Sequence, residues 1–173
     1  MARAGEPGKT WRARCAAALL GVLAATGALA QQQALGGGEV VIGQVAPLSG
    51  VLASTGEQMV LGGRIYFDAV NDQGGVNGAR IRHKVVDDGY KVEDTVRLTR
   101  ELLARPDTVA LFGFAGTANI AKLLEEGVLE RGGAALVAPY TGGEPLRNPF
   151  NPWIFHVRAG YGDEAEHMVQ QVT

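Results

Sequence analysis

The chain has 173 residues and carries 16 lysines and arginines against 18 aspartates and glutamates, a formal net charge of −2. This balance argues against a nucleic-acid partner, because binding to phosphates calls for clustered basic residues. Its single cysteine, Cys15, excludes an intrachain disulfide, so the fold must depend on a buried core.

The first thirty residues show the features of a secretory signal in their usual order. Basic residues precede an apolar run over 15–29, and small residues follow up to Ala30. The run is only about fifteen residues long, whereas a helix that spans a bilayer needs roughly twenty. We predict a signal peptide over 1–30, a flexible leader over 31–39, and export across the inner membrane to the periplasm.

From Val40 onward, β-branched apolar runs alternate with segments of helical periodicity. Strands are predicted over 40–46, 80–87, 108–113, 134–138 and 153–157, and helices over 57–71, 92–103, 117–130 and 163–172. Polar and apolar residues alternate in the second strand, so we expect it to be partly exposed rather than central. The alternation of strands and helices predicts an α/β domain over 40–173, with a parallel sheet covered by helices on both faces.

The loops that follow the predicted strands form the candidate site, because ligands of open parallel sheets bind beyond the carboxyl ends of the strands. These loops, at 47–56, 87–90, 114–117 and 139–143, are rich in Gly, Ser or Thr and contain no Lys or Arg. They therefore favour hydrogen bonding to a small polar ligand over neutralisation of phosphates.

The loop from Gly113 through Gly116 to Thr117 is the sharpest local signal, since it leads a strand through two glycines into a helix. The amino end of a helix favours an anion, and a Thr117 hydroxyl would add a donor to a carboxylate. A phosphate-binding loop would require a lysine that is missing here. The competing interpretation is that Thr117 only caps its helix.

The sequence predicts no catalytic site, no metal site and no cofactor. Its three histidines, at 83, 156 and 167, have no spacing that brings two of them together, and Asp87-Asp88 is typical of a turn cap. The Gly-x-Ser-x-Gly pattern of a nucleophile elbow is also lacking.

Several short motifs, each weak alone, form a specific set by their order and spacing. They are Ile42-Gly43, Pro47-Leu-Ser-Gly50, Gly56, Gly62, Asn71, Gly74-Gly-Val-Asn-Gly78, Val86-Asp-Asp88 and Gly113 before the threonine-bearing helix start. In this set the chain resembles the N-terminal lobe of periplasmic solute-binding proteins of the leucine/isoleucine/valine-binding (branched-chain amino acid ABC transporter) family.

The resemblance implies a type I periplasmic-binding fold, in which two Rossmann-like α/β lobes close on a ligand. It implies a monomeric, non-enzymatic substrate-binding component of an ABC importer, with a permease as partner and an amino acid or similar small carboxylate as ligand. The implied ligand-binding residues are Thr117 for the α-carboxylate, Tyr140 and Thr141 for the α-ammonium, and also Gly116 and Thr55. Thr55 stands where an aromatic residue often lines the pocket, which argues against leucine-like specificity.

The second lobe of that family is absent from the sequence, which predicts a fragment or a truncated gene product. Three alternatives stay open: a periplasmic sensory domain, a non-functional fragment, or an exported α/β enzyme, since fold alone does not determine function. The enzyme would have to use Asp87, Asp88 and His156.

Overall fold

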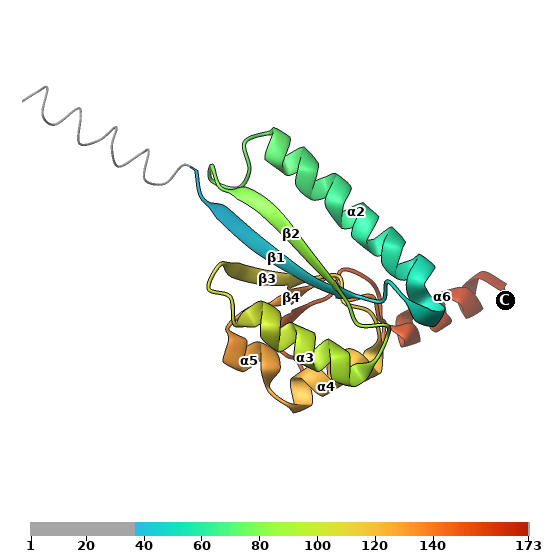
Figure 1. Ribbon diagram of the computed structural model, residues 1–173. Coiled ribbons are helices and arrows are strands. Elements are labelled where there is room, and N and C mark those ends of the chain that lie inside the picture. Colours follow the sequence, from blue (N-terminus) through green and yellow to red (C-terminus); the bar gives the residue numbers. More distant parts are fainter. Residues whose placement is uncertain (1–36, 173) are drawn as a thin grey trace, which may run out of the picture.

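Residues 37–172 are described by the computed structural model of the protein, and within them five strands form one parallel sheet (Figure 1). The strands are β1 (Glu39–Ala46), β2 (Arg80–Asp87), β3 (Thr108–Phe112), β4 (Leu136–Val137) and β5 (Ile154–Phe155), in the spatial order β2-β1-β3-β4-β5. Neighbouring strands pair in parallel throughout. The predicted α/β fold with a parallel sheet is confirmed, while the predicted signal peptide lies outside the described residues.

Helices cover both faces of the sheet. They are the short 3₁₀ helices η1 (Gly50–Leu52) and η2 (Glu144–Leu146), and the α-helices α2 (Ala53–Asp72), α3 (Val92–Leu103), α4 (Thr117–Glu125), α5 (Val128–Gly132) and α6 (Tyr161–Val172). Helix α2 packs on one face against β1 and β2, and α3, α4 and α5 lie on the opposite face (Figure 1).

The prediction of one continuous helix over 117–130 is wrong. Gly127 adopts left-handed backbone angles, with φ of 54°, and a new helix begins at Val128. Glycine reaches this conformation without the steric cost that a Cβ atom brings, so the chain changes direction there. By contrast, α3 has the predicted bounds, while β4 and β5 are shorter than expected.

The main core lies between the sheet and helices α3, α4 and α5. It contains the strand residues Val45, Leu111, Leu136 and Ile154, and the helix residues Val96, Leu98, Leu102, Ile120, Leu123, Val128 and Leu129. Each fully buried aliphatic side chain contributes about 1.5–3 kcal/mol relative to an exposed one. This cluster holds β3 and β4 side by side, which sets the position of the loops that follow them.

The second face of the sheet is less completely covered. Beside α2, a pocket of about 340 Å³ opens between Gly63 and Phe67 of the helix and Phe112 and Val137 of the sheet, and its walls are apolar. Strand β2 lies at the edge of the sheet and has no fully buried residue, as its alternating pattern predicted.

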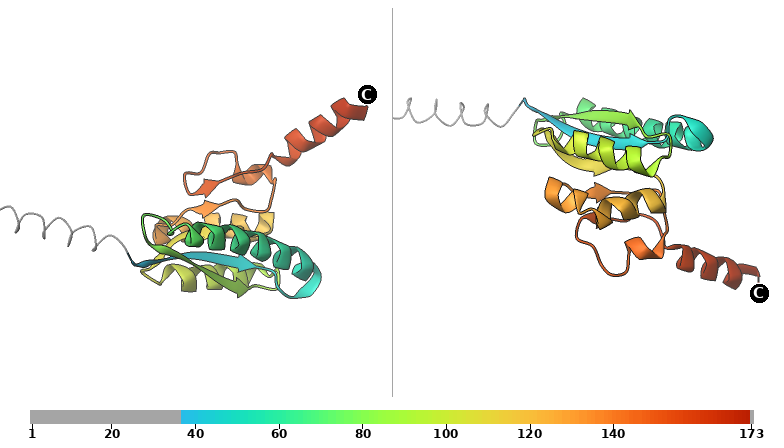
Figure 2. Two further views of the ribbon diagram at one scale, coloured as in Figure 1. Left: turned by 90° about the horizontal axis from the view of Figure 1, so that it is seen from above. Right: turned by 60° about the horizontal axis from the view of Figure 1, so that its bottom comes forward.

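Helix α6 projects away from the rest of the structure, as both views in Figure 2 show. It contains no buried residue. Within residues 37–172, none of the helices has the length and apolar character that crossing a bilayer requires.

Candidate functional site

The loops that follow β3 and β4 meet at the carboxyl edge of the sheet. Ala115 and Tyr140 form a parallel bridge beyond the two strands, and the amide of Tyr140 donates to the carbonyl of Phe114 at 2.7 Å. The backbone pairing of the strands therefore continues into the loops. It places Thr117 and Tyr140 at the same end of the sheet.

Two threonine hydroxyls form the centre of the candidate site. The Oγ1 atoms of Thr117 and Thr141 lie 2.6 Å apart, and the amide of Gly143 donates to the Thr141 Oγ1 at 3.0 Å. Thr141 is fully buried and Thr117 is half-buried. The α4 N-cap is Gly116, and no side chain caps this helix end, so the interpretation of Thr117 as a helix cap is wrong.

Glycines let the loops approach each other closely around the threonine pair. A methyl group on Gly143 would come within 2.5 Å of the Thr117 side chain, and one on Gly142 would come within 2.6 Å of the Tyr161 ring. Gly116 has φ of 96°, a conformation that side chains rarely adopt. These positions leave backbone amides and hydroxyls in contact where larger residues would separate them.

A buried glutamine supports the loop from below. Gln44 of β1 has no exposed surface; its Nε2 donates to the carbonyl of Gly113 at 3.0 Å, and its Oε1 lies 2.9 Å from the His83 Nε2. Burial and the nearby Arg64 guanidinium lower the pKa of His83 below 6.5. The imidazole is therefore favoured in its neutral form, in which one ring nitrogen donates to Gln44.

A second polar network lies beneath the loop that follows β2. The buried Asp88 carboxylate accepts the amide of Tyr90 at 2.9 Å through Oδ1 and the Thr95 hydroxyl at 2.5 Å through Oδ2. Asn119 of α4 donates to the same hydroxyl at 2.8 Å. This chain of hydrogen bonds ties the β2 loop to the first turn of α4.

The neighbouring Asp87 closes the turn itself. Its Oδ1 accepts the amides of Leu48 and Gly89, each at 2.8 Å. Desolvation is the largest single influence and opposes ionisation, but the hydrogen bonds from Ser49, Gly89 and Leu48 together outweigh it and lower the pKa of Asp87. Both aspartates thus act in turns, as the sequence predicted, and among residues 37–172 no group of three His, Cys, Asp or Glu side chains is placed to hold a metal ion.

Tyrosines and one arginine border the threonine pair. The Arg158 guanidinium lies 5.6 Å from the ring centroids of both Tyr140 and Tyr161, and it also forms an ion pair with Glu164. A hydrogen bond with the Thr141 hydroxyl, together with contacts to Gly142 and the Arg158 charge, lowers the pKa of Tyr161. The Tyr161 phenol is thereby joined to the threonine pair.

The structure brings four of the five predicted site residues together. Gly116, Thr117, Tyr140 and Thr141 share the β3 and β4 loops. Thr55 lies instead in the first turn of α2, and in the described part of the chain it has no hydrogen bond with the other four.

Sequence reasoning missed Tyr90, Arg158 and Tyr161 as site residues. Tyr90 stands in a loop already assigned to the site, so its place directly after β2 was a usable signal. Tyr161 comes six residues after β5 as the first residue of α6, outside the loops that the sequence analysis assigned to the site. Its ring reaches the site only because Gly142 leaves room for it.

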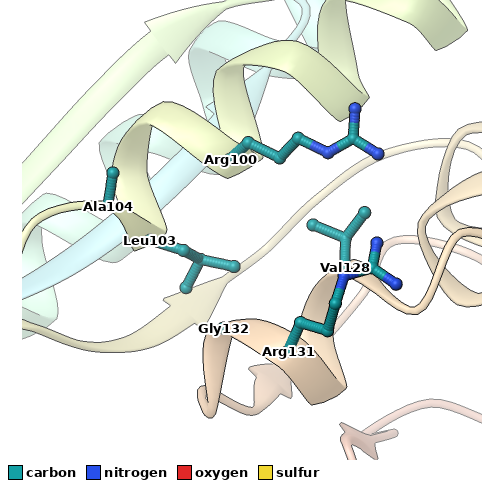
Figure 3. Close-up of a pocket in the computed structure, with 6 residues that line it drawn as sticks. All are labelled: Arg100, Leu103, Ala104, Val128, Arg131 and Gly132. Atoms are coloured by element: carbon teal, nitrogen blue, oxygen red, sulfur yellow. The ribbon is translucent and has the colours of Figure 1, made fainter.

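A separate pocket of about 270 Å³ lies at the opposite edge of the sheet, between the end of α3 and α5 (Figure 3). It is lined by Arg100, Leu103, Ala104, Val128, Arg131 and Gly132. Arg100 pairs with the Glu126 carboxylate and Arg131 donates to the Glu126 carbonyl.

Comparison with known proteins gives a consistent result. The family model described as periplasmic binding protein matches residues 39–173. Among curated proteins, the chain is similar to the Leu/Ile/Val-binding protein homolog 3 of Brucella melitensis biotype 1, with 25% identity over 134 residues, which is 78% of this chain and 36% of that protein.

Solved structures show the same likeness. A substrate-binding periplasmic protein from Ralstonia solanacearum is 38% identical, with a TM-score of 0.73 over 78% of this chain and 37% of the other. A branched-chain amino acid transporter substrate binding protein from Streptococcus pneumoniae, solved in complex with isoleucine, shares the fold at 20% identity, with a TM-score of 0.60 over 70% of this chain and 34% of the other. The chain therefore spans a little over a third of the length of these relatives, which are binding proteins rather than enzymes.

Proposed function

The chain belongs to the periplasmic binding protein family, and on this premise we propose that it is the substrate-binding component of an ABC importer that takes up an amino acid or a similar small carboxylate. The proposed ligand-binding residues are Gly116, Thr117, Tyr140 and Thr141 of the β3 and β4 loops, together with Thr55 of α2.

The observation that supports this proposal best is the hydroxyl pair of Thr117 and Thr141 at the start of α4. The first amides of a helix have no intrahelical partner, and the helix dipole places partial positive charge there. Hydroxyls and amides can together donate hydrogen bonds to a carboxylate without a cationic side chain. The nearby Arg158 already has Glu164 as its ion-pair partner, so it leaves that role to the threonine pair.

The proposal includes the compartment and the partners. The predicted signal peptide would deliver the chain to the periplasm after cleavage behind Ala30, and the loaded protein would act as a monomer on a permease in the inner membrane. Mass spectrometry of the exported protein should find Gln31 as the first residue. A first residue at Met1 would contradict the export step.

Binding is tested by isothermal titration calorimetry of the exported chain against L-leucine, L-isoleucine, L-phenylalanine, benzoate and succinate. At least one of these should bind, and Thr117→Val should weaken that binding about tenfold or more, because a hydrogen bond to a charged group contributes roughly 1.5–3 kcal/mol. Absence of heat with every probe would refute the proposal.

A matched control is available at the other edge of the sheet. The Thr108 hydroxyl donates to the Leu102 carbonyl at 2.8 Å, far along the strand from the candidate site. Thr108→Val removes the same chemical group and should lower stability slightly while leaving affinity unchanged. Equal weakening by both valine substitutions would show that Thr117 acts through folding alone.

A further inference from the structure

Tyrosine side chains gather at the carboxyl edge of the sheet. Three of the chain's four tyrosines lie there, and Tyr90, Tyr140 and Tyr161 remain 38%, 51% and 50% exposed. Tyr90 and Tyr140 lie in two different loops and Tyr161 is the first residue of α6, so the grouping is produced by the fold rather than by sequence adjacency. Aromatic surface concentrated at one exposed place is typical of a binding surface.

The ring of Tyr90 is held against the start of α4. A side chain on Gly116 would come within 2.7 Å of the Tyr90 ring. Tyr90 has φ of 64°, an unfavourable conformation for a residue with a Cβ atom, and its amide is held by the buried Asp88 carboxylate. Such a conformation persists only where the surrounding structure enforces it, and it is typical of functional sites.

The other two rings are positioned by one arginine. The Arg158 guanidinium packs at 5.6 Å from both the Tyr140 and the Tyr161 centroids, while Glu164 balances its charge. A cation over an aromatic face contributes attraction and also fixes the ring. Arg158 is thus a positioning residue for two aromatic side chains beside the Thr117 and Thr141 hydroxyls.

We infer that the ligand of this site is a small carboxylate with an aromatic ring, which packs among Tyr90, Tyr140 and Tyr161. This inference rests on the proposed function and specifies its substrate class. The threonine pair would hold the carboxylate, and the tyrosines would contact the ring. Aromatic pairs gain stabilisation beyond the area they bury, which an aliphatic ligand of equal size does not obtain.

The test compares ligands that differ only in aromaticity. Benzoate and cyclohexanecarboxylate, and L-phenylalanine and L-cyclohexylalanine, are titrated calorimetrically into the exported chain. The aromatic member of a pair should bind roughly 2- to 12-fold more tightly. Tyr140→Leu and Tyr161→Leu should bring the ratio toward one, whereas Tyr161→Phe, which keeps the ring, should retain the preference.

The ratio of two affinities measured on one preparation does not depend on the folded fraction, so a partly unfolded variant remains informative. Equal or tighter binding of the saturated compounds would overturn the aromatic specificity and leave the proposed carboxylate binding in place. Failure of every carboxylate to bind would instead refute the proposed function itself.

Discussion

Gly143 provides a direct test of the close contact between the β3 and β4 loops. Its backbone angles, φ −62° and ψ 122°, are ordinary for alanine, so Gly143→Ala introduces no backbone strain. The added methyl group would lie 2.5 Å from Thr117 Cγ2 and 2.9 Å from Thr117 Oγ1. The three nearest atoms that the added methyl group would meet all belong to Thr117.

The expected cost follows from this clash. Overpacking of a well-packed region costs about 1–3 kcal/mol, and removal of a glycine from the unfolded state returns roughly 0.4–1 kcal/mol. We expect Gly143→Ala to lower the free energy of unfolding by about 1–2 kcal/mol. For a domain of this size each kcal/mol lowers the melting temperature by about 4 °C.

A double-mutant cycle with Thr117→Ala separates this clash from other effects. Thr117→Ala removes the two nearest of the three Thr117 atoms that the new methyl group would meet and leaves only the Cβ, at 3.3 Å, so Gly143→Ala should cost much less in that background. Urea unfolding of the four proteins gives the coupling energy. Equal cost of Gly143→Ala in both backgrounds would refute the contact.

Gly62 supplies the matched control for this cycle. It lies on the exposed side of α2, and nothing lies within 4 Å of the position that a methyl group would occupy. Gly62→Ala should stabilise the protein by about 1 kcal/mol, the usual difference in helix propensity. The contrast between two glycine-to-alanine changes thus reports on local packing.

Three further predictions concern the support of the sheet. Gln44→Leu should cost about 1–3 kcal/mol in urea unfolding, because the carbonyl of Gly113 and the His83 Nε2 would lose their buried partner. His83→Gln should flatten the dependence of melting temperature on pH. Because the pKa of His83 is lowered in the folded protein, the unfolded chain takes up the proton first, and the wild type loses stability as pH falls below 6.5. The variant has no imidazole at this position and should not show that loss. Asn71→Leu should also lower the free energy of unfolding by about 1–3 kcal/mol, because the Asn71 side chain pairs with both the amide and the carbonyl of Ile81, at 2.7 and 2.8 Å. An unchanged urea midpoint would contradict this role.

Much of the architecture could be predicted from the sequence because it is encoded locally. The apolar periodicity of 92–103 predicted the bounds of helix α3. The alternating pattern of 80–87 predicted a partly exposed strand rather than a central one, and β2 lies at the edge of the sheet. The glycines at 74, 75 and 78 lie between α2 and β2, and all three have positive φ, which is typical of a tight turn. These features depend on residues within a few positions of one another.

Local patterns failed where a single backbone angle or a distant partner decides the outcome. The helix predicted over 117–130 is interrupted at Gly127, because this residue adopts φ of 54°. The presence of a glycine inside a segment of helical periodicity does not by itself predict that conformation. Thr117 has the residue type of a helix cap, yet its hydroxyl pairs with Thr141, which lies 24 residues further along the chain.

By itself, then, the sequence determined the alternation of strands and helices, the family, and the loops that meet at one edge of the sheet. The tertiary structure decided which side chains meet there. Asp88 fixes Tyr90, Arg158 packs against the rings of Tyr140 and Tyr161, and Gly142 leaves room for the Tyr161 ring. The physical reason is that backbone periodicity is a property of neighbouring residues, whereas the composition of a site depends on packing between segments brought together only when the core forms.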